Sequence, residues 1–354
     1  MPHVVVVGQA FKGSLSAADV ARALGDGAAA TGASTTVIVG SDGGDGLLDA
    51  IAAPRRASHR VTGPLGEPVE AAVGWIDSHT AVIESRLACG VALIPWERRD
   101  PERTTTRGVG ELLMELAGAG ASDVIVGLGG SATMDGGLGA ARAWGWRARD
   151  ERGADLPDGG GALGRLHALE PGRALGVAVT ALADVRNPLL GPAGSAVFAR
   201  QKGATPEVTT RLLAGLQRLV DCAASWNGPA IAERPGAGAA GGLGFGLACF
   251  GGARLEPGAA WVLARAGFAA ALGRADAVVV AEATFDATSL AGKLTGEVVG
   301  QARAAGVPVA VVTPRPFIRP PGVVVLNRRG HWRPADVATM CERAARRLLR
   351  LPRT

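Results

Sequence analysis

Tyrosine is absent from this 354-residue chain, and all aromatic residues together make up only 4% of it. Proteins that hold single-stranded nucleic acid stack its bases on aromatic side chains, so a nucleic-acid platform of that kind is not expected. The net charge of +5 would by itself suit either nucleic acid or a small anionic substrate. With so few rings available, we expect a small-molecule substrate and no nucleic-acid partner.

Cysteines are few and far apart, at Cys89, Cys222, Cys249 and Cys341, without a C-x-x-C pair. This spacing argues against a zinc site or a disulfide framework and favours a reducing compartment. No apolar run approaches the roughly 20 residues of a membrane span, and no basic leader precedes the first apolar stretch. We therefore expect a cytoplasmic protein without a membrane partner, either a monomer or a homodimer.

Lysine is rare, occurring only at Lys12, Lys202 and Lys293, although the chain has 37 basic residues. Each of the three lies within two residues of a glycine. A compact ammonium is not interchangeable with a planar guanidinium. We infer that these positions require lysine, the alternative being that lysine survived there by chance.

The first 60 residues alternate strand and helix patterns. Buried strands are predicted at residues 4–7 and 35–39, with helices at 17–30, capped by Ser16, and at 47–53. In a parallel sheet, ligands bind at the carboxyl ends of strands, where Asp42 and Asp45 fall. These carboxylates could hold Mg²⁺ or substrate hydroxyls, or could instead form Asx turns or helix caps.

The strand pattern also predicts the domain organisation. Short hairpin strands from residue 61 interrupt the parallel pattern, which returns at residues 277–281, 307–312 and 323–326. We predict an α/β fold with two domains: a Rossmann-like parallel sheet domain formed by both chain ends, residues 1–60 and 270–354, and an inserted mixed α/β domain, residues 61–269. The active-site cleft is expected between them. An Arg-rich amphipathic helix is predicted at residues 341–354.

A glycine-rich turn at residues 127–137, GLGGSATMDGG, follows a β-branched run and precedes a helical pattern. Glycine lets the backbone approach a ligand closely, and the first amides of a helix favour an anion. We interpret this turn as a cradle for a phosphate or a carboxylate, the alternative being a tight turn without a ligand. A second glycine-dense stretch, residues 236–246, fits either close approach to a nucleotide or packing of a small-residue helix.

Several motifs, in this order, resemble those of the type-1 glycerate kinases. They are FKGSLSA (11–17), DGGDG (42–46), GLGGSATMDGG (127–137), Asp184 with Asn187-Pro188-Leu189, QKGATPE (201–207) and GAAGGLG (238–244). The resemblance covers roughly residues 3–312. It implies phosphorylation of D-glycerate, typically at the 2-hydroxyl, with ATP and Mg²⁺.

The chain departs from the family pattern at a few positions. Gln9 and Arg186 stand where the family usually has aspartate, and residues 280–286, VAEATFD, lack two glycines and one basic residue of the family's stretch. Glu282, Asp286 and Lys293 are kept. These changes leave two alternatives open: a kinase of another small hydroxy acid or polyol, or a catalytically silent nucleotide-binding relative.

Phosphoryl transfer requires that the reactants be held in position and that the charge of the phosphates be neutralised. We assign these roles to charged and polar residues of the motifs. Asp184 is the expected base, with Lys12 and Lys293 as the other catalytic residues. Asp42 and Glu282 are the expected metal ligands. Expected substrate-binding residues are Asp42, Arg86, Ser131, Asn187, Lys202 and Asp286. Expected nucleotide-binding residues are Gly129, Gly130, Thr133, Gly241 and Gly242.

Overall fold

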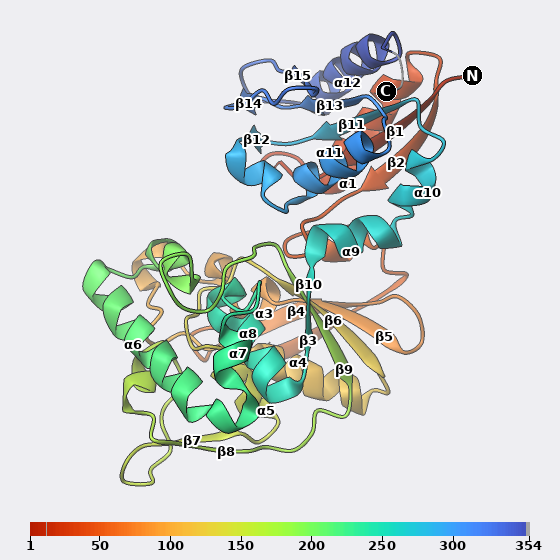
Figure 1. Ribbon diagram of the computed structural model, residues 1–354. Coiled ribbons are helices and arrows are strands. Elements are labelled where there is room, and N and C mark those ends of the chain that lie inside the picture. The colour runs from red at the N-terminus through yellow and green to blue at the C-terminus, as the bar shows by residue number, and fades with distance from the viewer. Residues whose placement is uncertain (12, 352–354) are drawn as a thin grey trace. The chain divides into compact units, whose positions relative to one another are not determined.

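The structure, a computed structural model, describes residues 1–11 and 13–351 (Figure 1). The predictions for Lys12 and for residues 352–354 lie outside this part of the chain. The chain divides into two compact units. Unit 1 comprises residues 1–42, 49–52 and 258–354, and unit 2 comprises residues 43–48 and 53–257.

Unit 1 is built on a five-stranded parallel sheet of order β15-β13-β11-β1-β2. The strands are β1 (His3–Gly8), β2 (Ser34–Val39), β11 (Ala277–Ala281), β13 (Val309–Val312) and β15 (Val324–Leu326). Two-residue strands, β12 (Thr284–Phe285) and β14 (Arg315–Pro316), pair separately. The prediction of five parallel strands drawn from both chain ends is confirmed.

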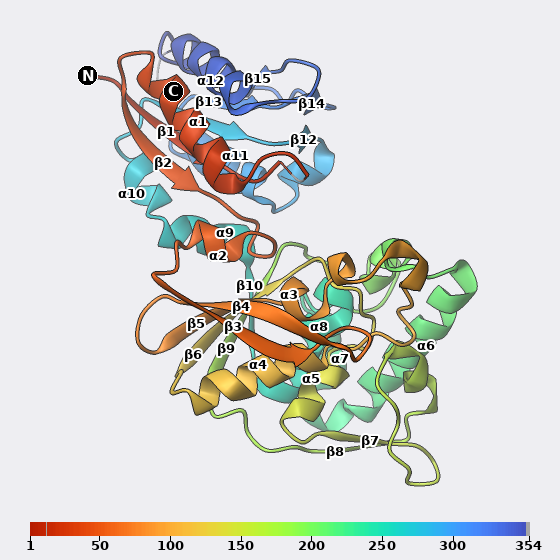
Figure 2. The ribbon, with the colours of Figure 1, turned by 180° about the vertical axis from the view of Figure 1, so that it is seen from behind.

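Helices cover both faces of this sheet, which explains the uninterrupted valines of β1. Val4 and Val6 pack in one core with α1 and α12, whereas Val5 and Val7 face a second core with α9, α10 and α11. Figure 2 shows α1 and α12 lying over one face of the sheet. These helices are α1 (Ala17–Ala29), α9 (Gly258–Arg265), α10 (Phe268–Leu272), α11 (Leu294–Ala304) and α12 (Pro334–Leu348), with the 3₁₀ turn η7 (Ala287–Leu290).

Unit 2 contains a six-stranded mixed sheet of order β10-β9-β6-β5-β4-β3. Its strands are β3 (Arg55–Thr62), β4 (Pro68–Trp75), β5 (Thr80–Glu84), β6 (Asp123–Leu128), β9 (Ala178–Ala183) and β10 (Arg254–Pro257). The β3–β4 and β4–β5 pairs are antiparallel, as the hairpin pattern predicted, and the other three pairs are parallel. A short antiparallel ribbon joins β7 (Arg147–Arg149) and β8 (Ala168–Glu170).

One large apolar core fills unit 2 beneath its helices. The α-helices are α3 (Arg86–Cys89), α4 (Arg107–Gly118), α5 (Leu138–Ala143), α6 (Pro206–Cys222), α7 (Gly228–Ala232) and α8 (Ala239–Gly251). The 3₁₀ turns are η1 (Val91–Leu93), η2 (Trp96–Arg98), η3 (Gly160–Arg165), η4 (Ser195–Phe198), η5 (Arg200–Lys202) and η6 (Ala224–Trp226).

Local signals located the helix starts better than the helix ends. Ser16 caps α1 by accepting from the backbone of Asp19, and Thr205 caps α6 in the same way. The predicted helix at 47–53 is shorter, because α2 (Leu47–Ala50) is followed by Ala52 in a left-handed conformation, φ 46°. The tail helix was placed too late in the sequence: α12 begins at Pro334, and its apolar side is buried in unit 1.

Candidate functional site

The glycine-rich turn after β6 does not present its helix amides to a ligand. The buried carboxylate of Asp135 accepts from Gly137 N at 3.1 Å and Gly139 N at 3.2 Å, and also from the backbone and hydroxyl of Thr106 at 2.8 Å each. Burial raises the pKa of Asp135, although these hydrogen bonds favour its ionised form. The predicted anion site at the start of α5 is therefore wrong, since the chain's own carboxylate occupies that position.

The first half of the turn, residues 129–131, borders a small cavity of about 80 Å³. The other lining residues are Asp184, Val185, Phe198, Gln201, Lys202 and Ala240. Gly130 is exposed and has φ +60°, a conformation that glycine adopts at little cost. Three separate segments of unit 2 thus supply polar groups to one cavity: the end of β6, the end of β9 and the turn η5.

Lys202 is the most deeply buried cation of this site, with 2% of its surface exposed. Its Nζ donates to Ser131 Oγ at 2.9 Å and to the carbonyl of Thr133 at 2.7 Å. Burial lowers the pKa of Lys202 to about 8. The lysine has no carboxylate among its hydrogen-bond partners, so its ammonium suits an incoming anion.

Acidic and basic side chains surround the first two glycines of the turn. A Cβ added to Gly129 would lie 3.9 Å from Asp184 Oδ2 and 3.8 Å from Asp45 Oδ1. A Cβ added to Gly130 would lie 3.2 Å from both Asp45 Oδ1 and the Cβ of Arg86. Only a residue without a side chain leaves this space open between the charged groups.

Arg86 is held at the turn by Glu84, a residue that sequence reasoning missed. Glu84 is 2% exposed, accepts from Leu48 N at 2.9 Å, and pairs with Arg86 Nε at 2.7 Å. Arg86 Nε also lies 3.4 Å from Asp45 Oδ1. Glu84 is the last residue of β5. Asp184 was selected from the sequence because it is a carboxylate at the end of a strand, and the same pattern could have identified Glu84.

The predicted nucleotide-binding glycines of α8 pack behind the turn. Gly241 and Gly242 are buried, with φ +68° and +90°. A Cβ on Gly241 would lie 1.7 Å from Thr133 O, and one on Gly242 would lie 2.8 Å from Gly136 Cα. Of the two interpretations of this stretch, the structure shows the packing of a small-residue helix against the turn.

In unit 1, polar side chains gather where β1 and β11 end. Gln9 Nε2 donates to Glu282 Oε2 at 2.8 Å and to Thr295 Oγ1 at 3.0 Å, and Thr295 Oγ1 donates to the same glutamate oxygen at 2.7 Å. Burial raises the pKa of Glu282, and the nearby charge of Asp42 raises it further. Gln9, which replaces the family's usual aspartate, therefore stabilises Glu282 instead of repelling it.

Asp42, Asp286 and Lys293 lie in the same region of unit 1, each with a local structural contact. Asp42 Oδ1 accepts from Leu294 N, the first residue of α11, at 2.6 Å. Asp286 caps η7 by accepting from Thr288 N at 2.8 Å and Ser289 N at 3.2 Å. Lys293 Nζ lies 3.4 Å from Thr288 Oγ1.

The remaining predicted residue, Asn187, donates through Nδ2 to the carbonyl of Ala193 at 2.5 Å and does not line the small cavity. Within residues 1–11 and 13–351, no group of three or more His, Cys, Asp or Glu side chains is arranged to hold a metal. None of the helices in the described part of the chain has the length and hydrophobicity to cross a bilayer.

Comparison with known proteins assigns the chain to a family. The model of the glycerate kinase family matches residues 4–315. The chain belongs to this family. Among curated relatives, a glycerate kinase of Bacillus subtilis (strain 168) is 38% identical over 317 residues, covering 86% of this chain and 83% of the relative.

Two further relatives agree with that assignment. A glycerate 2-kinase of Escherichia coli (strain K12) is 36% identical over 303 residues, covering 82% of this chain and 79% of its own. A crystal structure described as glycerate kinase 2 of Salmonella typhimurium LT2 superposes with a TM-score of 0.83 at 33% identity, covering 98% of both chains. The similarity thus extends to the fold of nearly the whole chain.

Proposed function

We propose that this protein phosphorylates D-glycerate at its 2-hydroxyl, with ATP as the phosphoryl donor and Mg²⁺ as the metal ion. The observation that carries this proposal is the small cavity of unit 2, onto which a buried ammonium and a strand-end carboxylate both open. Its volume of about 80 Å³ suits a three-carbon acid. Membership of the glycerate kinase family supports the same substrate.

Lys202 and Ser131 bind the carboxylate of glycerate in this proposal. The ammonium of Lys202 is fixed by two protein acceptors and has no carboxylate hydrogen-bond partner. A buried cation whose hydrogen-bond partners are both neutral gains strongly from an anion that arrives with the substrate. Arg86, held by Glu84 beside Gly130, adds a second positive charge near the turn.

Asp184 acts as the general base and accepts the proton of the attacking hydroxyl. It lines the cavity from the end of β9, close to the open space over Gly129. The absence of side chains at Gly129 and Gly130 leaves room there for the phosphoryl group in transfer, and their backbone can approach it closely. Thr133 contributes indirectly, because its carbonyl holds Lys202.

Asp42 and Glu282 of unit 1 fit the requirements of a magnesium site. Their charges interact, since Asp42 raises the pKa of Glu282, and Mg²⁺ is commonly bound by one or two carboxylates together with substrate phosphates. When bound, the ion would neutralise charge on the phosphates of ATP. Lys293 and Lys12 are proposed to add positive charge toward the same phosphates.

An ADP-release assay with Mg·ATP and D-glycerate tests the proposal, with the position of the phosphate on the product read by NMR. ADP release that depends on D-glycerate and a product phosphorylated at the 2-hydroxyl are expected. Failure to turn over glycerate would contradict the proposal. A panel of small hydroxy acids and polyols in the same assay would then identify a different acceptor, and calorimetry with ATP would identify a silent nucleotide-binding protein.

A further inference from the structure

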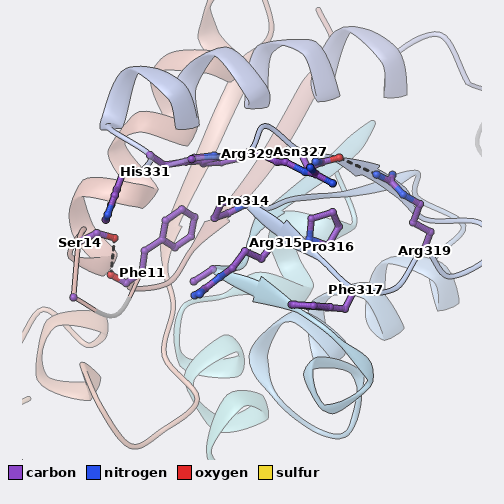
Figure 3. A pocket seen from close by; sticks show the side chains of 14 residues that line it. Phe11, Ser14, Pro314, Arg315, Pro316, Phe317, Arg319, Asn327, Arg329 and His331 are labelled. Atoms are coloured by element: carbon purple, nitrogen blue, oxygen red, sulfur yellow. Dashed lines mark hydrogen bonds between the residues drawn. The ribbon is translucent and has the colours of Figure 1, made fainter.

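A wide cavity of unit 1 lies outside the carboxyl edge of its parallel sheet. Its volume is about 870 Å³, within the range of sites that hold cofactors and drug-sized ligands. Segments that follow four of the five strands line it: Phe11 after β1, Ala283 after β11, Pro314 after β13 and Asn327 after β15 (Figure 3). Phe11 and Ser14 belong to the FKGSLSA motif, whereas the other loops of the lining carry no motif that predicted this site.

The strand order places this cavity at the point where the direction of the sheet's connections reverses. From β1 the chain adds β2 on one side, whereas β11, β13 and β15 are added successively on the other side. The reversal therefore lies between β1 and β11, and open parallel sheets bind their ligands at such a point. Phe11 and Ala283, which follow these two strands, both line the cavity.

The described residues that line the cavity carry positive charge and no carboxylate. The positive charge comes from Arg315, Arg319 and Arg329 (Figure 3). Arg319 is fixed by Val325 O and Asn327 Oδ1, each at 2.8 Å. Arg315 and Arg329 form no ion pair with any residue that the structure describes, and both are exposed. Exposed guanidinium groups without an ion-pair partner in the described part of the chain favour a ligand with phosphate oxygens.

Aromatic rings form the other part of the lining. Phe11 and Trp332 are buried and pack against each other, with ring centroids 5.8 Å apart. Phe317, in contrast, is 71% exposed. Its backbone is held in place, because Phe317 N donates to Phe285 O at 2.8 Å. An exposed phenyl ring on a fixed backbone offers a face on which a nucleobase can stack.

We infer that this cavity binds the nucleotide, with the adenine base stacked on Phe317 and the phosphates bound by Arg315 and Arg329. This inference rests on the proposed kinase function, which requires a nucleotide. The cavity of unit 2, at about 80 Å³, is too small for one. Ala283 on the cavity wall directly follows Glu282, so the phosphates would lie beside the carboxylates proposed to hold Mg²⁺.

Calorimetry with ADP tests the inference on the full-length chain. The double variant Arg315→Gln/Arg329→Gln should raise the Kd for ADP at least tenfold, and Phe317→Ala should raise it about fivefold. Phe317→Trp should keep the wild-type Kd, because it preserves the stacking face. The matched control is Arg343→Gln, an exposed arginine of α12 that does not line the cavity, and it should bind ADP as the wild type does.

Thermal unfolding and steady-state kinetics separate loss of binding from loss of fold or of catalysis. The substituted side chains are exposed, so the Tm of each variant should stay within about 2 °C of the wild type. KM for ATP should rise with the Kd, whereas KM for glycerate should change less than twofold. If the enzyme phosphorylates glycerate but the double variant binds ADP with wild-type affinity, the inference is overturned and the proposed function stands. If the variants lose ADP binding but the wild-type protein does not phosphorylate glycerate, the inference is supported and the proposed function is contradicted.

Discussion

At the scale of single residues, the rarity of lysine was the most informative feature of the sequence. Of the two lysines that the structure describes, Lys202 is almost fully buried and Lys293 is the N-cap residue just before α11. An arginine could not replace Lys202 easily, since its larger planar head would have to fit among Ser131, Thr133 and the backbone of α8. The inference that lysine is required is therefore best supported at this position.

Substitution of the proposed base is expected to reduce turnover without changing the fold. Asp184→Asn keeps the size of the side chain and removes its ability to accept a proton, so kcat should fall about 10²- to 10⁴-fold. KM for glycerate should change little. Asp221→Asn, at an exposed site on α6, is the control and should retain wild-type kinetics. A kcat within threefold of wild type for Asp184→Asn would exclude this residue as the base.

The pKa of Lys202 predicts how substrate binding depends on pH. Because burial lowers this pKa to about 8, the ammonium is charged below that value and neutral above it. KM for glycerate should be constant below about pH 7.5 and rise steadily above pH 8. In Lys202→Met, KM should be higher throughout and should lose this dependence. A wild-type KM that stays flat up to pH 9 would contradict the assignment.

The same shift in the pKa of Lys202 affects the stability of the ligand-free protein in the opposite direction. The pKa falls from 10.5 to about 8 on folding, so between these values the unfolded chain binds a proton that the folded chain does not. This contribution to the free energy of unfolding therefore increases as pH rises through that window. Comparison of urea unfolding for wild type and Lys202→Met between pH 7.5 and pH 10 isolates the contribution.

At the scale of elements, the kinked start of α8 supports the turn after β6. Residues 240–242 have left-handed φ and ψ, which bring the backbone of α8 against Thr133 and Gly136. This contact fixes the carbonyl that holds Lys202. The second glycine-dense stretch thus acts on the site through packing, and its composition alone could not distinguish that role from direct contact with a nucleotide.

A pair of glycine substitutions measures this packing. Gly241 and Gly252 both have φ +68°, but a Cβ on Gly241 would meet Thr133 O at 1.7 Å, whereas one on Gly252 would meet nothing within 4 Å. Gly252→Ala should cost about 1 kcal/mol from backbone strain alone. Gly241→Ala should cost more than about 3 kcal/mol by adding a steric clash. Equal losses in urea unfolding would show that packing at Gly241 is unimportant.

At the scale of the whole molecule, removal of Mg²⁺ should stop catalysis without unfolding the chain. Asp42 and Glu282 already have protein hydrogen-bond partners, so the fold does not depend on the ion. EDTA should abolish ADP release and leave the Tm of the nucleotide-free protein within about 2 °C. Excess Mg²⁺ should restore activity. A large fall in Tm with EDTA would instead indicate a structural metal.

The sequence by itself determined the fold class, the parallel strands contributed by both chain ends and the family. Continuous valine runs require burial on both sheet faces, and cap residues and glycine turns act over a few neighbouring residues. These signals are local, so they can be read without the fold. They also identified Asp184, Lys202 and Ser131 as candidates, because each lies in a motif at the end of a strand or beside a turn.

Only the tertiary structure decided which of these side chains meet. Asp135 and Lys202 both lie in motifs that contain glycine. The carboxylate of Asp135, however, accepts from backbone amides at the start of α5, whereas the ammonium of Lys202 opens onto a cavity. The cavity of unit 1 was not predicted, since Phe11, Arg315 and Arg329 come together only when β1, β13 and β15 join one sheet. Contacts between residues hundreds of positions apart depend on packing, which a single sequence does not encode in any local pattern.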